Sequence, residues 1–324
     1  MSSEVAVESS GLTSVCVIIV NWNSGDLLQR CLASVESQTL QPRRVLVFDN
    51  ASVDGSLERA RAGFPRVEFI ASAENAGFAR ANNLCVQRCT DCDWIFLLNP
   101  DAFPAPDCLE NLLAEARKAP DLDCFAPLIL QEQAPDKIDS AGDCYRLSGI
   151  ALHRLHGLPR TMAGEATEVF SPCAAAALYR RAAFVECGGF DESYFAYYED
   201  VDLGFRMQLR GFRTMFTPGA VVHHVGGGTT GGGGNVHSVF HGQRNFIVTW
   251  FKDMPAALFW PGLPLHLWAI LKGLARGVRY GQGILMLRAT WLAFMSLPRY
   301  LAARQSVQSQ RRISAASLKR VMAA

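Results

Sequence analysis

The C-terminal part of the sequence has no acidic side chains: residues 254–324 contain neither Asp nor Glu. Ten Lys and Arg residues lie in the same stretch, and the preceding 253 residues carry 21 basic and 30 acidic side chains, a formal charge of −9. The small overall charge of +1 therefore combines a negative body with a positive tail. This uneven distribution of charge predicts a negatively charged partner for the tail.

Two glycine-rich phosphate-binding motifs are also absent. No G-x-G-x-x-G follows the first predicted strand, and no G-x-x-x-x-G-K-[ST] occurs anywhere. The sequence thus lacks the dinucleotide fingerprint and the phosphate-cradling loop. Any phosphate that this chain binds must be neutralised by a metal ion or by Arg and Lys side chains.

A secretion signal and a disulfide pattern are missing as well. The chain starts MSSEVAVESSG, with two Glu and no basic segment before an apolar one, so we expect a cytoplasmic protein. The ten cysteines are scattered through apolar or helical stretches and are expected to be reduced thiols. Cys85, Cys89 and Cys92 have a spacing that also suits zinc, but no fourth ligand lies nearby, which favours plain thiols.

The remaining pattern is that of an α/β protein. The chain has 324 residues, 49% of them hydrophobic, which is enough for one large core or two modest ones. Apolar runs predict strands at residues 15–20, 44–48, 67–70 and 94–98. Helical periods lie between them, at residues 25–38, 54–62 and 77–88. This alternation predicts βαβ crossovers and a mostly parallel sheet flanked by helices.

Polar residues follow each predicted strand. In an open parallel sheet ligands bind at the carboxyl ends of the strands, so we expect these residues to line a site. A role in turns and caps explains any one of them, but it explains the joint pattern poorly. They are Asn21, Asp49, Asn50, Asn75, Asn99 and Asp101.

Carboxylates in two segments are candidates for chemistry. Asp101 follows Pro100 after a buried strand, where it suits a divalent cation that also binds substrate phosphates; a helix-capping role is the alternative. Glu199 and Asp200 follow an aromatic segment, residues 194–198, that excludes water and favours a general base. Acids in the first turn of a helix are also stabilised by the helix dipole, which is the simpler explanation.

Histidines and glycines follow the last predicted strand. His223 and His224 end an apolar run and precede a glycine-rich segment, residues 226–234. This order favours a ligand with a mobile lid behind it, whereas a flexible linker is the alternative for the glycines. Arg244 follows closely and suits a diphosphate, although an ordinary surface position is nearly as well supported.

With these residues assembled, the chain resembles the inverting family 2 glycosyltransferases with the GT-A fold, in particular their rhamnosyltransferase-like bacterial branch. The resemblance runs over residues 15–251 and implies a Rossmann-like nucleotide-binding sheet. It rests on five ordered motifs: VIIVNWN (17–23), VFDNASVDGS (47–56), ENAGFARANN (74–83), LLNPDA (97–102) and GGFDESYFAYYEDVDLGFR (188–206).

The resemblance also implies roles for single residues. Asp200 matches the catalytic base and Glu199 stands beside it. Asp101 and His224 match the ligands of Mg²⁺ or Mn²⁺, with His223 as the fallback. Asn99 occupies the position where many relatives have the first Asp of the D-x-D motif. The residues that match the donor-binding set are Asn21, Asp49, Asn50, Asn75, Gly77, Phe78, Asn82, Asn99 and Arg244.

This resemblance predicts a division of the chain and a set of partners. Residues 1–12 are expected to be disordered, residues 13–130 to bind a nucleoside-diphosphate sugar, and residues 131–253 to bind the acceptor and carry the base. The resemblance implies a hydroxyl of a lipid-linked glycan or a polysaccharide as the acceptor and rhamnose as the sugar. Two rivals stay open: a sugar nucleotidyltransferase, and a noncatalytic nucleotide-sugar-binding scaffold.

Residues 254–324 are interpreted as a cationic amphipathic tail. Residues 254–271 carry no formal charge, but Pro255, Pro261 and Pro264 argue against a membrane-spanning helix. Lys272 and Arg276 recur at helical spacing among apolar residues, which favours the inner face of an anionic membrane over nucleic acid. A helical pair that packs back on the body or forms a homodimer is the alternative.

Overall fold

The computed structural model describes residues 14–226 and 235–322. The predicted disordered segment, residues 1–12, therefore lies outside the described residues. The same holds for residues 227–234, most of the glycine-rich segment interpreted as a lid or a linker.

The N-terminal half of the central sheet is a parallel βαβ unit, as the alternating pattern predicted. Its strands lie in the order β3-β2-β1-β4, and each agrees with its predicted range to within one residue. They are β1 (Val15–Asn21), β2 (Arg44–Asp49), β3 (Glu68–Ala71) and β4 (Trp94–Leu98). The connecting helices are α1 (Leu27–Glu36), α2 (Ser56–Gly63) and α3 (Gly77–Val86).

Helices cover both faces of this half because β1 is apolar on both sides. Its residues Val15, Val17 and Ile19 share a core with α1, whereas Cys16 and Ile18 share another core with α3. A strand buried on both faces reads as a continuous apolar run, which is why the pattern could be recognised. Cys85, Cys89 and Cys92 are buried in the second core and are free thiols.

The second half of the sheet mixes strand directions. β11 (Ala176–Arg180) is antiparallel to β4 and β6, and β6 is parallel to β12. The other strands of this half are β5 (Ala102–Pro104), β6 (Cys124–Gln131), β7 (Ala134–Ser140), β10 (Thr167–Val169) and β12 (Thr214–His224). β8 (Asp143–Tyr145) and β9 (Ala151–His153) form a separate hairpin. The helices are α4 (Cys108–Lys118), α5 (Arg181–Glu186) and α6 (Glu199–Arg210), with short 3₁₀ turns at Arg160–Met162 and Glu192–Tyr194.

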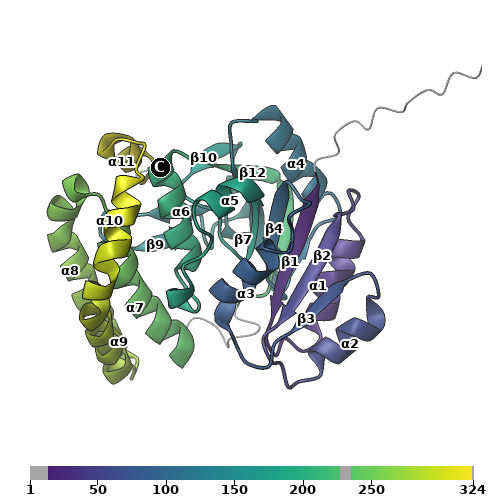
Figure 1. The fold of residues 1–324 in the computed structure, drawn as a ribbon, viewed down its shortest axis with the longest axis horizontal. Helices are drawn as coiled ribbons and strands as arrows, with labels where there is room; N and C mark the ends of the chain where they lie inside the picture. The colour runs from purple at the N-terminus through teal and green to yellow at the C-terminus, as the bar shows by residue number, and fades with distance from the viewer. Residues whose placement is uncertain (1–13, 227–234, 323–324) are drawn as a thin grey trace, which may run out of the picture.

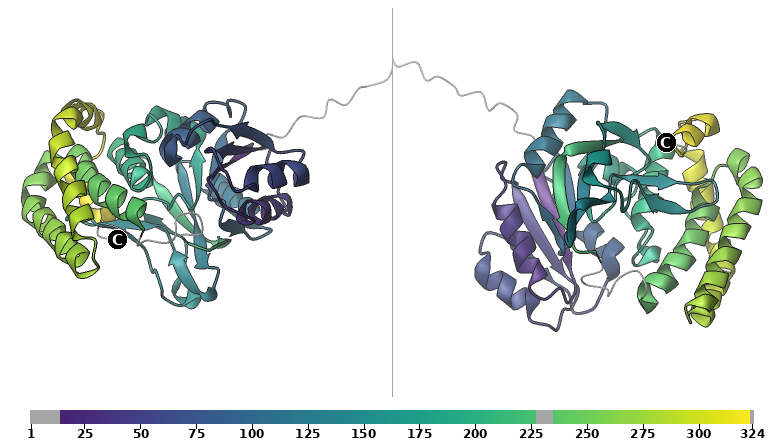
Figure 2. Two further views of the ribbon diagram at one scale, coloured as in Figure 1. Left: turned by 90° about the horizontal axis from the view of Figure 1, so that it is seen from below. Right: turned by 180° about the vertical axis from the view of Figure 1, so that it is seen from behind.

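The C-terminal helices form a layer at one end of the molecule, opposite β2 and β3 (Figure 1). Figure 2 shows the same arrangement from below and from behind. The helices are α7 (Val236–Asp253), α8 (Ala256–Arg279), α9 (Gly283–Ser296), α10 (Leu301–Ser309) and α11 (Ala315–Met322), with a 3₁₀ turn at Leu297–Tyr300. The α/β class with added C-terminal helices is therefore confirmed.

The C-terminal layer packs on the body of the protein. Helices α9 and α10 pack against α7, and Leu318 and Met322 of α11 share a core with Phe205 and Leu209 of α6. One side of this layer thus packs on the body, as in the alternative in which the tail helices fold back. None of the helices within residues 14–226 and 235–322 combines the length and the hydropathy needed to cross a bilayer.

The other side of the layer exposes large apolar side chains on α8 and α9. Trp260, Trp268 and Trp291 are each more than half exposed. Exposed basic side chains lie on the same two helices: Lys272, Arg276, Arg279 and Arg288. We call these residues, together with Leu271, Ile284 and Leu287, the α8–α9 surface.

Candidate active site

A cavity of about 660 Å³ lies where the two halves of the sheet meet. Its wall combines residues that lie far apart in the sequence, because the carboxyl ends of β1, β2 and β4 converge with β12 and the start of α6. Nine of the thirteen predicted site residues are in the wall: Asn50, Asn75, Gly77, Phe78, Asn99, Asp101, Glu199, Asp200 and His224.

Asp101 and His224 lie side by side because β5 pairs with β12. Ala102 is the register partner of His224, and His224 Nε2 lies 3.4 Å from Asp101 Oδ1. The other ring nitrogen, Nδ1, lies 2.8 Å from Asp139 Oδ2 on β7. Burial alone lowers the pKa of the His224 imidazole, but the hydrogen bonds to Asp101 and Asp139 outweigh burial and raise it to about 9.

This arrangement fits a divalent cation. Asp139 orients the imidazole through Nδ1 and leaves Nε2 toward Asp101, as second partners of metal-binding histidines do. Asp101 is 3% exposed and its neighbour Asn99 supplies an amide to the same wall. Asp139 did not stand out in the sequence, since only the antiparallel pairing of β7 with β6 brings it to His224.

Asp200 lies in the first turn of α6, on the wall of the same cavity. Its Oδ2 accepts a hydrogen bond from the Ala174 N–H at 3.0 Å, and its Oδ1 accepts from the Val201 N–H at 2.8 Å. Burial and the charge of Asp143 raise its pKa, and the two N–H bonds offset part of that rise. The result is a carboxylate that is held in place and is more basic than an ordinary Asp.

Glu199 has a different environment. It is 6% exposed, and its Oε2 has no hydrogen-bond partner among the described residues. Burial and the charge of Asp200 raise its pKa well above the ordinary value. Burial therefore favours the neutral form of the Glu199 carboxyl.

Four predicted site residues lie outside the wall in the described part of the chain: Asn21, Asp49, Asn82 and Arg244. Asn21 and Asp49 are buried and hydrogen-bonded to each other at 2.7 Å. Asn21 also donates to the hydroxyls of Ser52 and Ser56 at 3.1 and 3.0 Å. Both residues thus fix the loop after β2, next to Asn50 in the wall, and a direct contact with a nucleotide stays a prediction for them.

Asn50 and Gly77 shape the donor side of the wall. Asn50 Oδ1 accepts from the Ala76 N–H at 3.0 Å, and its Nδ2 donates to the Gly77 carbonyl at 3.3 Å. Asn75 Oδ1 accepts from the Gly77 N–H at 2.9 Å. Asn82 is buried behind the wall, where its Nδ2 donates to the Phe78 carbonyl at 2.9 Å. These amides fix the first turn of α3 rather than leaving it to move.

The aromatic loop that precedes Asp200 closes over α3. The Phe195 carbonyl accepts from the backbone N–H groups of Phe78 and Ala79 at 2.7 and 3.2 Å, which caps the helix. Gly77 has φ +81°, and a Cβ at this position would lie 2.7 Å from the Phe195 carbonyl oxygen. Only glycine permits this close contact between the two halves of the site.

The same loop is held from behind by α7. Left-handed backbone occurs at Phe195 (φ 65°), Tyr197 (φ 67°) and Tyr198 (φ 69°). Asn245 Nδ2 donates to the carbonyls of Tyr194, Ala196 and Tyr197 at 3.1, 3.0 and 2.7 Å. Arg244 donates to the Ser193 carbonyl at 3.1 Å and to the Tyr300 hydroxyl at 3.0 Å, so its predicted contact with a diphosphate stays a prediction.

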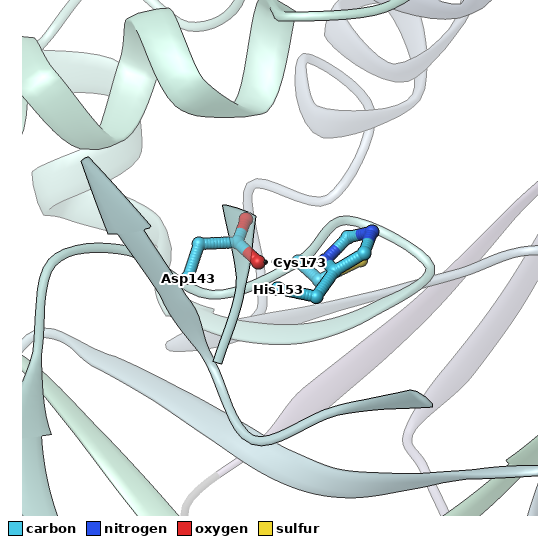
Figure 3. Close-up of side chains that lie close together, drawn as sticks. All are labelled: Asp143, His153 and Cys173. Atoms are coloured by element: carbon cyan, nitrogen blue, oxygen red, sulfur yellow. Dashed lines mark hydrogen bonds and ion pairs between the residues drawn. The ribbon is translucent and has the colours of Figure 1, made fainter. Parts of the chain in front are cut away.

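A further group in the wall had no signal in the sequence. Asp143, His153 and Cys173 bring a carboxylate, an imidazole and a thiol together beside Asp200 (Figure 3). His153 Nδ1 lies 2.8 Å from Asp143 Oδ1. Asp143 lies on β8, His153 on β9 and Cys173 in the loop before β11, so only the fold brings them together.

Comparison with known proteins gives the family. The sequence model described as "Glycosyl transferase family 2" matches residues 16–188, more than half of the chain. The N-acetylglucosaminyl-diphospho-decaprenol L-rhamnosyltransferase of Mycobacterium tuberculosis is 32% identical over 231 residues, 64% of this chain and 75% of the relative. The rhamnosyltransferase WbbL of Escherichia coli is 27% identical over 63% of this chain and 80% of its own length.

A solved structure supports the fold. The mannosyltransferase PcManGT from Pyrobaculum calidifontis, in complex with GDP-Man and Mn²⁺, superposes with a TM-score of 0.54 at 18% identity. The superposition covers 95% of this chain and 86% of that one. This chain belongs to glycosyl transferase family 2 and is a glycosyltransferase with the predicted fold.

Gly77→Ala should destabilise the protein by about 1–3 kcal/mol, because the new Cβ meets the Phe195 carbonyl and the backbone keeps a left-handed φ. The free energy of unfolding in urea measures this. Gly63→Ala, at a helical position with nothing within 4 Å of the added Cβ, is the matched control and should be neutral or slightly stabilising. Equal free energies for the two variants would contradict the proposed contact.

Proposed function

We propose that this family 2 enzyme transfers rhamnose from a nucleoside-diphosphate sugar to a hydroxyl of a lipid-linked glycan, with inversion at the anomeric carbon. The observation that carries the proposal is the shared cavity, which is lined by Asp101, His224 and Asp200 together. The sugar and the acceptor are inferred from the rhamnosyltransferase relatives, among them one named for a diphospho-decaprenol acceptor.

The donor occupies the side of the cavity formed by the parallel strands. Asn50, Asn75, Gly77 and Phe78 line that side, and the carboxyl ends of β1, β2 and β4 open onto it. Asp101 and His224 would hold Mg²⁺ or Mn²⁺ near the diphosphate. A divalent cation there offsets the charge that develops on the departing nucleoside diphosphate.

Asp200 acts as the general base. Its carboxylate takes the proton from the acceptor hydroxyl while that hydroxyl attacks the anomeric carbon on the face opposite the leaving diphosphate. The backbone N–H groups of Ala174 and Val201 hold the carboxylate in a fixed orientation. A single displacement inverts the configuration, and no second nucleophile is required.

Glu199 lies next to the base in a buried position. Burial and the charge of Asp200 raise the pKa of Glu199 well above its ordinary value, which favours its neutral form beside the base.

The acceptor reaches the cavity from a membrane surface. The α8–α9 surface exposes tryptophan and aliphatic side chains next to basic ones, a combination that suits the headgroup region of an anionic bilayer. Peripheral binding at the inner face of the plasma membrane would place the enzyme where lipid-linked glycans are built. A homodimer through the same surface is the competing arrangement.

Asp200→Asn should lower kcat by about 10²-fold or more, since the amide cannot accept the acceptor proton. Sugar transfer from dTDP-rhamnose to a lipid-linked acceptor measures kcat, and the Kd of the donor nucleotide should stay nearly unchanged. Asp121→Asn, at an exposed turn, is the control. A variant at Asp200 with full turnover would refute the assignment of the base.

The wild-type chain distinguishes the two alternative functions. Binding of the donor without any transfer would support the scaffold alternative. Synthesis of the activated sugar from a nucleoside triphosphate would support the nucleotidyltransferase alternative.

Asp139→Asn should raise the Mn²⁺ concentration needed for half-maximal transfer by about 10–100-fold, because the His224 ring loses the partner that orients it. Titration of transfer activity with Mn²⁺ after removal of metal by a chelator measures this. Asp136→Asn, at an exposed position of the same strand β7, is the matched control. Identical titrations for the two variants would exclude Asp139 as a positioning residue for the cation.

Replacing Trp260, Trp268 and Trp291 by Ser should weaken binding to anionic vesicles by about tenfold or more, since each buried aromatic contributes on the order of 1.5–3 kcal/mol. Cosedimentation of the full chain with phosphatidylglycerol vesicles measures this, and high salt should weaken binding further. A variant with Ser at Met162 and Val185, two exposed apolar positions elsewhere, is the control. A change from dimer to monomer in the tryptophan variant, without vesicle binding by the wild type, would establish the dimer instead.

A further inference from the structure

Asp143, His153 and Cys173 form a compact group of metal-ligating side chains in the cavity wall. Their ligand atoms all lie within 4.8 Å of one another (Figure 3). The group shares no residue with the Asp101–His224 pair and plays no part in the mechanism described above. It lies beside Asp200, because the residue after Cys173 donates its N–H to that carboxylate at 3.0 Å.

Backbone pairing brings the three residues together. Asp143 and His153 are direct cross-strand partners in the β8–β9 hairpin, which places both side chains on one face. A bridge between Asp143 and Ser171 fixes the loop that carries Cys173, with the Asp143 N–H donating to the Ser171 carbonyl at 2.8 Å. The group is therefore preorganised by main-chain contacts.

The three donor types select one class of ion. Mg²⁺ and Mn²⁺ prefer oxygen ligands, whereas a thiolate together with an imidazole and a carboxylate is typical of zinc sites. Asp143 and Cys173 are buried, but the His153 side chain is 45% exposed. An ion can therefore enter from the cavity, and three protein ligands leave one coordination position open, as in zinc sites with an exchangeable ligand.

We propose that Asp143, His153 and Cys173 bind a zinc-class ion at a second metal site, separate from Asp101 and His224 and adjacent to Asp200. This site goes beyond the proposed function, because its occupation does not depend on sugar transfer. An ion held there would add positive charge to the acceptor side of the cavity, close to the base.

Titration of the full-length, metal-free protein with Co²⁺, a spectroscopic substitute for zinc, tests the proposal. We expect one Co²⁺ per chain to show the near-ultraviolet charge-transfer absorption of a cobalt–thiolate bond, and Zn²⁺ to displace it; Co²⁺ at Asp101 and His224 would lack this absorption. Cys173→Ser should abolish that absorption, and His153→Gln should weaken binding by about tenfold or more. Cys144→Ser is the matched control, since it removes a neighbouring, partly exposed thiol on β8, and it should leave the spectrum unchanged.

Two results would overturn the site: no cobalt–thiolate absorption in the wild type, or the same absorption in Cys173→Ser. If Cys173→Ser does not fold, judged by its circular dichroism, His153→Gln decides, because its position is exposed. An unchanged Co²⁺ affinity in His153→Gln would then overturn the site. None of these readouts requires a sugar donor, so failure of the metal site and failure of the proposed transfer are distinguishable.

Discussion

The aromatic loop before Asp200 is the constraint on which the site depends. Three of its residues have a left-handed backbone, a conformation that costs of order 1–3 kcal/mol each. The Asn245 side-chain amide, through three hydrogen bonds to loop carbonyls, holds this conformation from behind. The Phe195 carbonyl caps α3 from the front. These contacts fix the position of the donor side of the cavity relative to the first turn of α6.

The side of the cavity that carries Asp101 and His224 is positioned by strand register rather than by a loop. Ala102 pairs with His224, which places Asp101 beside the imidazole. Asp139 then fixes which ring nitrogen faces Asp101. The parallel half of the sheet thus contributes the Asp101 carboxylate, and the mixed half contributes the His224 imidazole. Asn99 supplies an amide rather than a charge to the same wall.

Much of this could be predicted from the sequence, where the determinants are local. Strands buried on both faces are continuous apolar runs, and Asp101 and Asp200 stand in local motifs, so both were predicted. Asp139, Asn245 and Cys173 were not, since antiparallel pairing and helix packing across the fold bring them to the site. Asn21 and Asp49, which the motifs favour for the nucleotide, are buried and fix the loop after β2; their contact with a nucleotide stays a prediction. Local patterns identify residue types at strand ends, whereas the direction of a side chain depends on its distant neighbours.

The packing of the C-terminal layer has a geometric consequence. Helix α9 packs on α7, and α7 supplies Asn245, which holds the loop that precedes Asp200. A bilayer bound at the α8–α9 surface would therefore keep the reaction centre at a set height above the lipid. Only a carrier whose terminal sugar stands at that height would present its hydroxyl to the base. The helical layer would then restrict the enzyme to glycan acceptors of one length.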